Sequence, residues 1–369
     1  MKSNRLKSKL FFLVLVLGWA LPSMADTSIF KPVTSARRLM DVMYQNCQAS
    51  QLPPYDLFKD GEIRGYDLFP TPFDNGSVSH IADLSEARKT QRYLNCTGTG
   101  ENSIIDYLCE APPTYIYDGK GSFEHRNGKV LINPFENKKA IEDIAQHAGI
   151  DCSGFINLTF ALAGWRTYPN DSAEQSTAQM SAASFMKPNA CFRTVQVDAG
   201  EPLHPGDILA WSTHIAMVDS IGMDPFGLKN INSPEECTVA KINPDRFDIV
   251  LIHSRGGVDR ITKTDDLEVV ETNPRVKSMV EQAKPKLTGV GIGIARERIQ
   301  DILVSHPAVI MELAVSACLA KFGVHKKLFQ ISPIRHVLTE PGFSQLQLDE
   351  CRLPKEESVE LIGDDLICR

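Results

Sequence analysis

The sequence predicts an α+β protein, because apolar residues with helical spacing and runs with strand character occupy separate stretches of the chain. Helices are expected at 35–47, 137–149, 152–163 and 302–322. Four main strands are expected at 207–211, 214–218, 247–253 and 286–294, with shorter ones at 114–117 and 129–133. Residues 165–200 are expected to be irregular.

The helix from Cys152 to about Ala163 has the clearest sequence signals. Phe155, Leu158 and Leu162 share one helical face, and Gly164 follows as the residue type that ends helices. This helix is therefore expected to pack by its apolar face.

Composition limits the class of protein. The chain has 369 residues, of which 43% are hydrophobic, which is enough for a sizeable core and argues against global disorder. The formal net charge of −7 gives no electrostatic basis for nucleic-acid binding. No nucleic-acid partner is expected.

Residues 1–25 have the pattern of a signal peptide. A basic start carries Lys2, Arg5, Lys7 and Lys9, an apolar run follows over 10–21, and small residues precede Asp26. Cleavage would remove four positive charges and leave a net charge of −11. An uncleaved anchor is the alternative, and no transmembrane segment is expected in the mature chain. The protein is thus expected to be periplasmic or extracellular.

Nine cysteines fit an exported chain, in which most cysteines pair. The odd number leaves at least one of them free, and Cys152 is the candidate. Cys351 with Cys368 is the one local pairing that the spacing suggests. The nine are Cys47, Cys96, Cys109, Cys152, Cys191, Cys237, Cys318, Cys351 and Cys368.

Three regions are expected after the signal peptide. Residues 26–136 are rich in turn formers and carry three cysteines, which indicates a disulfide-tied wrapper. Residues 137–298 form the expected catalytic domain, and 299–369 a helical extension. The connection over 222–245 is long enough to be functional or loosely ordered.

The segment Asp151-Cys-Ser-Gly154 is the main candidate for chemistry. A thiol attacks as thiolate, and the positive end of a helix lowers its pKa. Free backbone N–H groups at a helix start can also bind a developing oxyanion, and Gly154 leaves room for a substrate. Cys152 is therefore the predicted nucleophile.

Two histidines on predicted strands are candidates for the base and its partner. His214 begins a short apolar strand, where an imidazole is held more firmly than on a loop. His253 ends another strand and is the predicted third member, which orients the base. Asp219 and Asp224 are alternatives for that third role. No His or Cys pair has zinc-ligand spacing, so no metal or other cofactor is expected.

These residues together resemble the NlpC/P60 family of cysteine peptidases, a branch of the papain-like superfamily. The match covers Asp151-Cys-Ser-Gly154, then Pro205-Gly-Asp207, then His214 and His253, within roughly 137–296. The resemblance implies a papain-like core, with the Cys-bearing helix on an antiparallel sheet. It also implies cleavage of peptidoglycan stem peptides, with Asp151 and Ser153 holding the substrate's amine.

The chain departs from the family pattern at two places. The aromatic and Trp-Gly-Gly segment usual before the Cys is replaced by residues 144–150, and His214 and His253 lie 39 residues apart, further than is usual. An insertion near 222–245 would explain the spacing and could cover the cleft.

Three readings of function remain open. The first is a monomeric peptidoglycan endopeptidase that works through a Cys-His-His triad and an acyl-enzyme. An amidase or transacylase with the same residues is the second. The third is a non-catalytic protein, either a cell-wall-binding module or a structural protein of the envelope.

Overall fold

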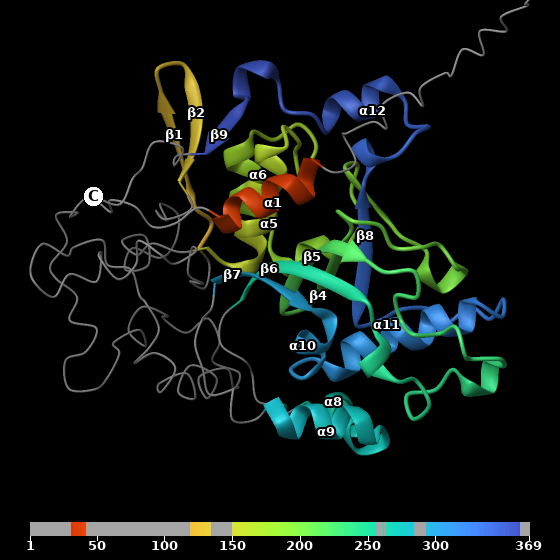
Figure 1. Cartoon of the computed structure of the whole chain (residues 1–369). Coiled ribbons are helices and arrows are strands. Elements are labelled where there is room, and N and C mark those ends of the chain that lie inside the picture. Colours follow the sequence, from red (N-terminus) through yellow and green to blue (C-terminus); the bar gives the residue numbers. More distant parts are fainter. Residues whose placement is uncertain are drawn as a thin grey trace, which may run out of the picture.

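Two β-sheets organise the part of the chain that the computed structural model describes, residues 31–41, 119–133, 150–255, 261, 263–283 and 293–361. The larger sheet has six strands in the order β3-β8-β4-β5-β6-β7, and every neighbouring pair is antiparallel (Figure 1). Its strands are β3 (Phe192–Thr194), β4 (Ile208–Trp211), β5 (His214–Ile221), β6 (Ile249–Arg255), β7 (Gly293–Arg298) and β8 (Ile331–His336).

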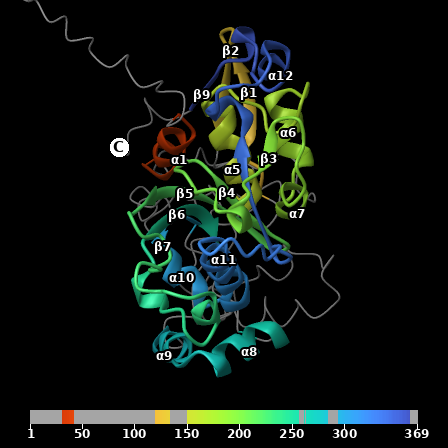
Figure 2. The ribbon, with the colours of Figure 1, turned by 90° about the vertical axis from the view of Figure 1, so that its right-hand side faces the viewer.

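Helices cover both faces of this sheet. α5 (Cys152–Leu162) and α1 (Lys31–Asp41) lie on one side, and α10 (Ile299–Leu303) and α11 (Pro307–Ala320) lie on the other (Figures 1 and 2). The predicted α+β class with an antiparallel sheet is confirmed. The predicted helix over 302–322 is divided in two, because Pro307 cannot donate a backbone hydrogen bond and starts a new helix.

Alternating residues of the strands build two cores, one on each face of the sheet. Ile215, Met217 and Ile252 belong to the core that contains α5. Ala216 and Leu251, which alternate with them, belong to the core that contains α10 and α11. Ten of the eleven residues of α5 are buried, and Leu162 is the exception. The helix is therefore buried on more sides than the single apolar face that the sequence predicts.

β8 corrects the expected organisation of the C-terminal region. The sequence predicted a helical extension over 299–369, but β8 lies inside the sheet, paired with both β3 and β4. The region from 299 onward therefore supplies part of the same sheet as the predicted catalytic domain. Residues 165–200 also hold more structure than expected: α6 (Ala173–Gln179), α7 (Ala182–Phe185) and β3.

A smaller sheet has the order β1-β2-β9. β1 (Ser122–Arg126) and β2 (Lys129–Asn133) form a hairpin, and β2 pairs in parallel with β9 (Val359–Leu361). β2 was predicted at these residues. The strand expected at 114–117 and the helix expected at 137–149 lie outside the described residues, as do the signal peptide and most of the wrapper.

Two disulfides tie distant segments of the described chain together. Cys191 is bonded to Cys351 and Cys237 to Cys318. The suggested Cys351–Cys368 pairing is wrong, because Cys351 is already bonded to Cys191, which lies 160 residues away in sequence. Cys152 is free, as predicted, and it is also buried.

The 222–245 connection packs beside α11. Cys237 anchors it to Cys318 of α11, and the Lys321 ammonium donates to the carbonyls of Leu228 and Ile231. Its buried residues join the core that contains α10 and α11, whereas Cys152 belongs to the core that contains α5. Two helices, α8 (Thr264–Thr272) and α9 (Pro274–Ala283), follow at the outer edge of this layer (Figure 1).

His336, at the end of β8, is completely buried in an aromatic cluster. Its ring stacks on Phe160 and Trp165 and meets the edge of Phe192. Its Nε2–H donates to the Arg166 carbonyl, 2.8 Å away. Burial lowers the pKa of His336 to about 4, so the ring is neutral at physiological pH.

His336 is predicted to make stability depend on pH. The pKa of His336 in the folded protein lies below the ordinary value of 6.5. Between these two values the unfolded chain binds a proton at His336 and the folded chain does not. The stability from neutral His336 is complete above pH 6.5 and falls by about 3 kcal/mol as the pH reaches 4. Urea unfolding at pH 7 and pH 4 should show a smaller pH-dependent loss for His336→Phe than for wild type. The exposed His325→Phe should behave as wild type, and an equal loss in all three would contradict this.

Candidate active site

Asp151 caps the N-terminus of α5 and shapes the approach to Cys152. Its Oδ1 accepts the Gly154 N–H, and its own N–H donates to the Gly119 carbonyl at 2.7 Å. A Cβ at position 154 would overlap that carbonyl oxygen. The glycine is therefore required for the close approach of the segment around Gly119, in addition to any room it leaves for a substrate.

Cys152 is the first residue of α5, and its thiol is enclosed by protein. Burial raises its pKa to about 12, and the neighbouring Asp151 carboxylate acts in the same direction. Lys120 and the backbone N–H groups of Ile215 and Ser153 favour the thiolate, but their effect is smaller. The thiol is therefore protonated at neutral pH, and attack by this sulfur would require a base to remove its proton.

His214 and His253 are in direct contact. His214 Nε2 lies 2.6 Å from His253 Nδ1, and the rings meet edge to face. On the far side of His253, Nε2 lies 3.2 Å from Glu297 Oε2. The side chains of His253 and Glu297 are only 2% and 14% exposed, so this part of the chain of polar groups is largely shielded from water, whereas His214 is half-buried.

The three groups come from three adjacent strands. Met217 pairs with Ile252 across β5 and β6, and His253 pairs with Ala295 across β6 and β7. These registers place His214, His253 and Glu297 at diagonal positions on one face of the sheet, within reach of long side chains.

The carboxylate defines which nitrogen carries each proton. Glu297 can only accept, so His253 donates from Nε2–H and its Nδ1 has a lone pair. His214 Nε2–H then donates to that lone pair, which leaves His214 Nδ1 unprotonated. His214 thus has the tautomer that a general base needs, with its basic nitrogen directed away from His253.

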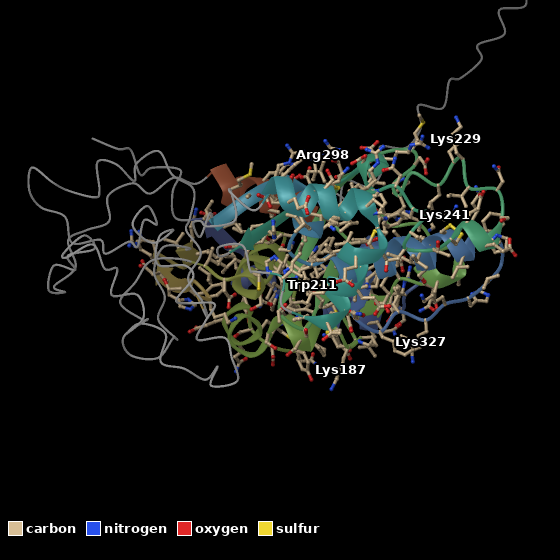
Figure 3. All side chains as sticks on the ribbon, turned by 90° about the horizontal axis from the view of Figure 1, so that it is seen from below. Lys187, Trp211, Lys229, Lys241, Arg298 and Lys327 are labelled. Atoms are coloured by element: carbon tan, nitrogen blue, oxygen red, sulfur yellow. A yellow bond between two sulfur atoms is a disulfide. The ribbon has the colours of Figure 1, made fainter. Side chains whose placement is uncertain are left out.

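Trp211 and His306 hold the His214 ring on its other sides. Trp211 packs edge to face on His214, and His306, next to the start of α11, stacks nearly parallel to it. Figure 3 shows Trp211 in the middle of the molecule, whereas the labelled Lys187, Lys229, Lys241, Arg298 and Lys327 lie toward its outside. The imidazole is therefore positioned by rigid aromatic neighbours.

The start of α5 is bonded to residues next to both histidines. The Ile215 N–H lies close enough to the Cys152 sulfur to favour its thiolate, and Ser254 Oγ donates to the Ile150 carbonyl at 2.7 Å. Ile215 and Ser254 each lie two residues past the Met217–Ile252 pair, which is the first pair between β5 and β6. The start of α5 thus meets the sheet at the strand ends that carry His214 and His253. The side chains of these two histidines alternate with those of Ile215 and Ser254 and point to the opposite face of the sheet.

The two expected substrate-binding residues are bonded to a lysine. Lys120 Nζ donates to Asp151 Oδ2 at 2.6 Å and to Ser153 Oγ at 2.5 Å. A substrate amine would meet acceptors that already have a cation, so the role of Asp151 and Ser153 in substrate binding stays a prediction.

The two alternatives for the third catalytic role are engaged elsewhere. Asp219 is buried and forms ion pairs with Arg37 of α1 and Arg296 of β7. Asp224 accepts the N–H groups of Leu228 and Lys229. His253 is the one of the three candidates that the structure joins to His214.

Glu297 and Lys120 were not identified from the sequence. Glu297 lies in the run Ala295-Arg-Glu-Arg298, whose charged character resembles a solvated edge strand. Lys120 is flanked by two glycines, and nothing in the local sequence relates it to a site 31 residues later. Both assignments require strand register and long-range contacts.

No family model, curated protein sequence or solved structure matches this chain. Among the described residues, no group of three or more His, Cys, Asp or Glu is arranged to hold a metal ion. In the same part of the chain, no helix has the length and apolar character needed to cross a membrane.

Glu297→Gln is predicted to reverse the tautomers of the histidine pair. The amide NH2 would donate to His253 Nε2, so Nδ1 would carry the proton and His214 would lose its basic Nδ1. Long-range ¹H–¹⁵N NMR of the imidazoles should show the proton of His253 moving from Nε2 to Nδ1. If the protein is a hydrolase, its turnover should fall by about 100-fold.

The surface substitution Glu268→Gln is the matched control and should leave both signals unchanged. An unaltered His253 tautomer in Glu297→Gln would contradict the assignment of Glu297 as the group that orients the pair.

Proposed function

We propose that this protein is an exported cysteine hydrolase of the NlpC/P60 type that cleaves peptide bonds in peptidoglycan stem peptides. The observation that carries the proposal is the bonding of the first turn of α5 to the strand ends that bear His214 and His253. That bonding joins the segment of the free thiol to the two strands that carry the oriented pair of imidazoles.

The proposed reaction begins with proton transfer from Cys152 to His214. As the sulfur attacks the peptide carbonyl, the thiol proton passes to His214 Nδ1, and His253 with Glu297 stabilises the imidazolium. Backbone N–H groups at the start of α5 stabilise the oxyanion. The imidazolium then protonates the leaving amine, an acyl-enzyme forms, and water releases it as a carboxylic acid with His214 as base.

The substrate class rests on the resemblance of three sequence segments to the NlpC/P60 pattern. The papain-like identity of the core is part of the same proposal: a Cys-bearing helix against an antiparallel sheet supports it. The two disulfides fit an oxidising compartment, which supports a periplasmic or extracellular site of action. That the protein acts as a monomer stays a prediction.

An amidase or transacylase with the same residues is the second candidate. Lys120 favours it, because its ammonium already occupies the acceptors that would hold the amine of a stem peptide. The non-catalytic readings are less well supported, since the His214–His253–Glu297 chain has the order expected of a general base.

Digestion of purified peptidoglycan should separate these candidates. Wild type is predicted to release muropeptides whose masses identify the cleaved bond, and Cys152→Ala should release none, because the nucleophile is gone. Mass spectrometry of the soluble fragments is the measurement. His214→Ala should also be inactive, while the surface variant Glu268→Gln should match wild type.

Release of the same fragments by wild type and Cys152→Ala would overturn the proposal that the activity is cysteine-dependent. If folded wild type releases no fragments, the peptidoglycan reading fails, and simple amide and ester substrates would test the second candidate.

A further inference from the structure

Lys120 is a buried cation beside the predicted nucleophile. Its side chain is 8% exposed and that of Asp151 is 7% exposed. The ammonium donates to Asp151 and Ser153, and Ser153 Oγ donates to Asp151 Oδ1 at 3.0 Å, so the three groups form a closed ring. Cys152 lies in sequence between the two residues that Lys120 binds.

The backbone fixes the segment that carries this lysine. The Gly119 carbonyl accepts the Asp151 N–H, and Lys120 forms an antiparallel bridge with Ile150. Gly154 permits the approach because it lacks a Cβ. Lys120 is therefore placed by contacts independent of its ammonium, so its position does not depend on the ion pair alone.

Charge at this position has a direct effect on the nucleophile. An uncompensated carboxylate next to a buried sulfur disfavours the thiolate through like-charge repulsion. A buried ammonium without a partner is equally costly. The Lys120–Asp151 pair keeps the formal charge at the start of α5 near zero, so that the helix N–H groups still favour a negative sulfur.

We propose that Lys120 is a positioning residue for catalysis, whose ammonium neutralises the Asp151 carboxylate and so enables the adjacent Cys152 thiol to ionise. This inference rests on the proposed function for the role of Cys152 as nucleophile. Asp151 caps the helix and binds the Gly119 segment, and Lys120 offsets part of the effect that the Asp151 charge has on Cys152.

The rate of Cys152 alkylation measures thiolate formation without any substrate. Folded wild type, Lys120→Met, Asp151→Asn and the double variant would react with iodoacetamide at pH 7.5, with modification at Cys152 followed by mass spectrometry. Each unit of thiol pKa changes the thiolate fraction about tenfold. Lys120→Met should react at least about tenfold more slowly and Asp151→Asn about tenfold faster. The neutral double variant should return to within about threefold of wild type.

This pattern separates charge from structure. If Lys120 served only to hold its segment in place, its removal would loosen the site, and Lys120→Met and the double variant would both react faster. Lys129→Met is the matched control, because Lys129 pairs with the exposed Glu360 and should not affect Cys152. Wild-type reactivity in folded Lys120→Met, or a double variant as slow as Lys120→Met, would overturn the proposal.

Circular dichroism and thermal melting establish that each variant is folded before its rate is compared. Should Lys120→Met fail to fold, Lys120→Gln keeps a hydrogen-bonding side chain without the charge and should be slowed in the same way. The outcome is also distinct from that of the peptidoglycan assay. The alkylation pattern can hold when no wall fragment is released, in which case the substrate class fails and the role of Lys120 stands.

Discussion

The buried start of α5 is the constraint on which the rest of the site depends. A helix begins with backbone N–H groups that lack intrahelical partners, and here water cannot supply them because the surrounding residues are buried. Asp151 satisfies one of these groups but brings a charge that itself needs a partner. The Lys120 ammonium is that partner, and the Gly119 carbonyl next to it accepts the Asp151 N–H. Together these contacts enclose Cys152.

The order of strands in the sheet provides the second half of the site. β5, β6 and β7 are neighbours, so an antiparallel register alone brings His214, His253 and Glu297 to diagonal positions. The buried His253 ring is costly unless both of its nitrogens have partners, and Glu297 meets this need by imposing one direction on the hydrogen bonds of the pair. The hydrogen-bond direction that gives His253 its two partners also leaves His214 Nδ1 unprotonated, as a general base requires.

Local signals in the sequence were sufficient where the structure depends on neighbouring residues. The start of α5, the strands β4 to β6 and the free thiol could be predicted because caps, alternation and an odd cysteine are local or countable properties. β8 could not be placed, since it lies between β3 and β4 and so pairs with segments over 100 residues earlier. The Cys191–Cys351 disulfide, Lys120 and Glu297 depend in the same way on contacts between distant segments.

The two halves of the site agree on one protonation state. Burial keeps the Cys152 thiol protonated, and Glu297 fixes the tautomer of the histidine pair in which His214 Nδ1 carries no proton. A resting thiolate–imidazolium pair would have to offset the free-energy cost of removing two charges from water. That cost is large in an enclosed site. In the proposed reaction, attack and proton transfer would therefore belong to one step, in which negative charge moves from sulfur to the substrate oxygen at the helix start. The nearby pair of Lys120 and Asp151 matters because this moving charge meets a site without net charge of its own.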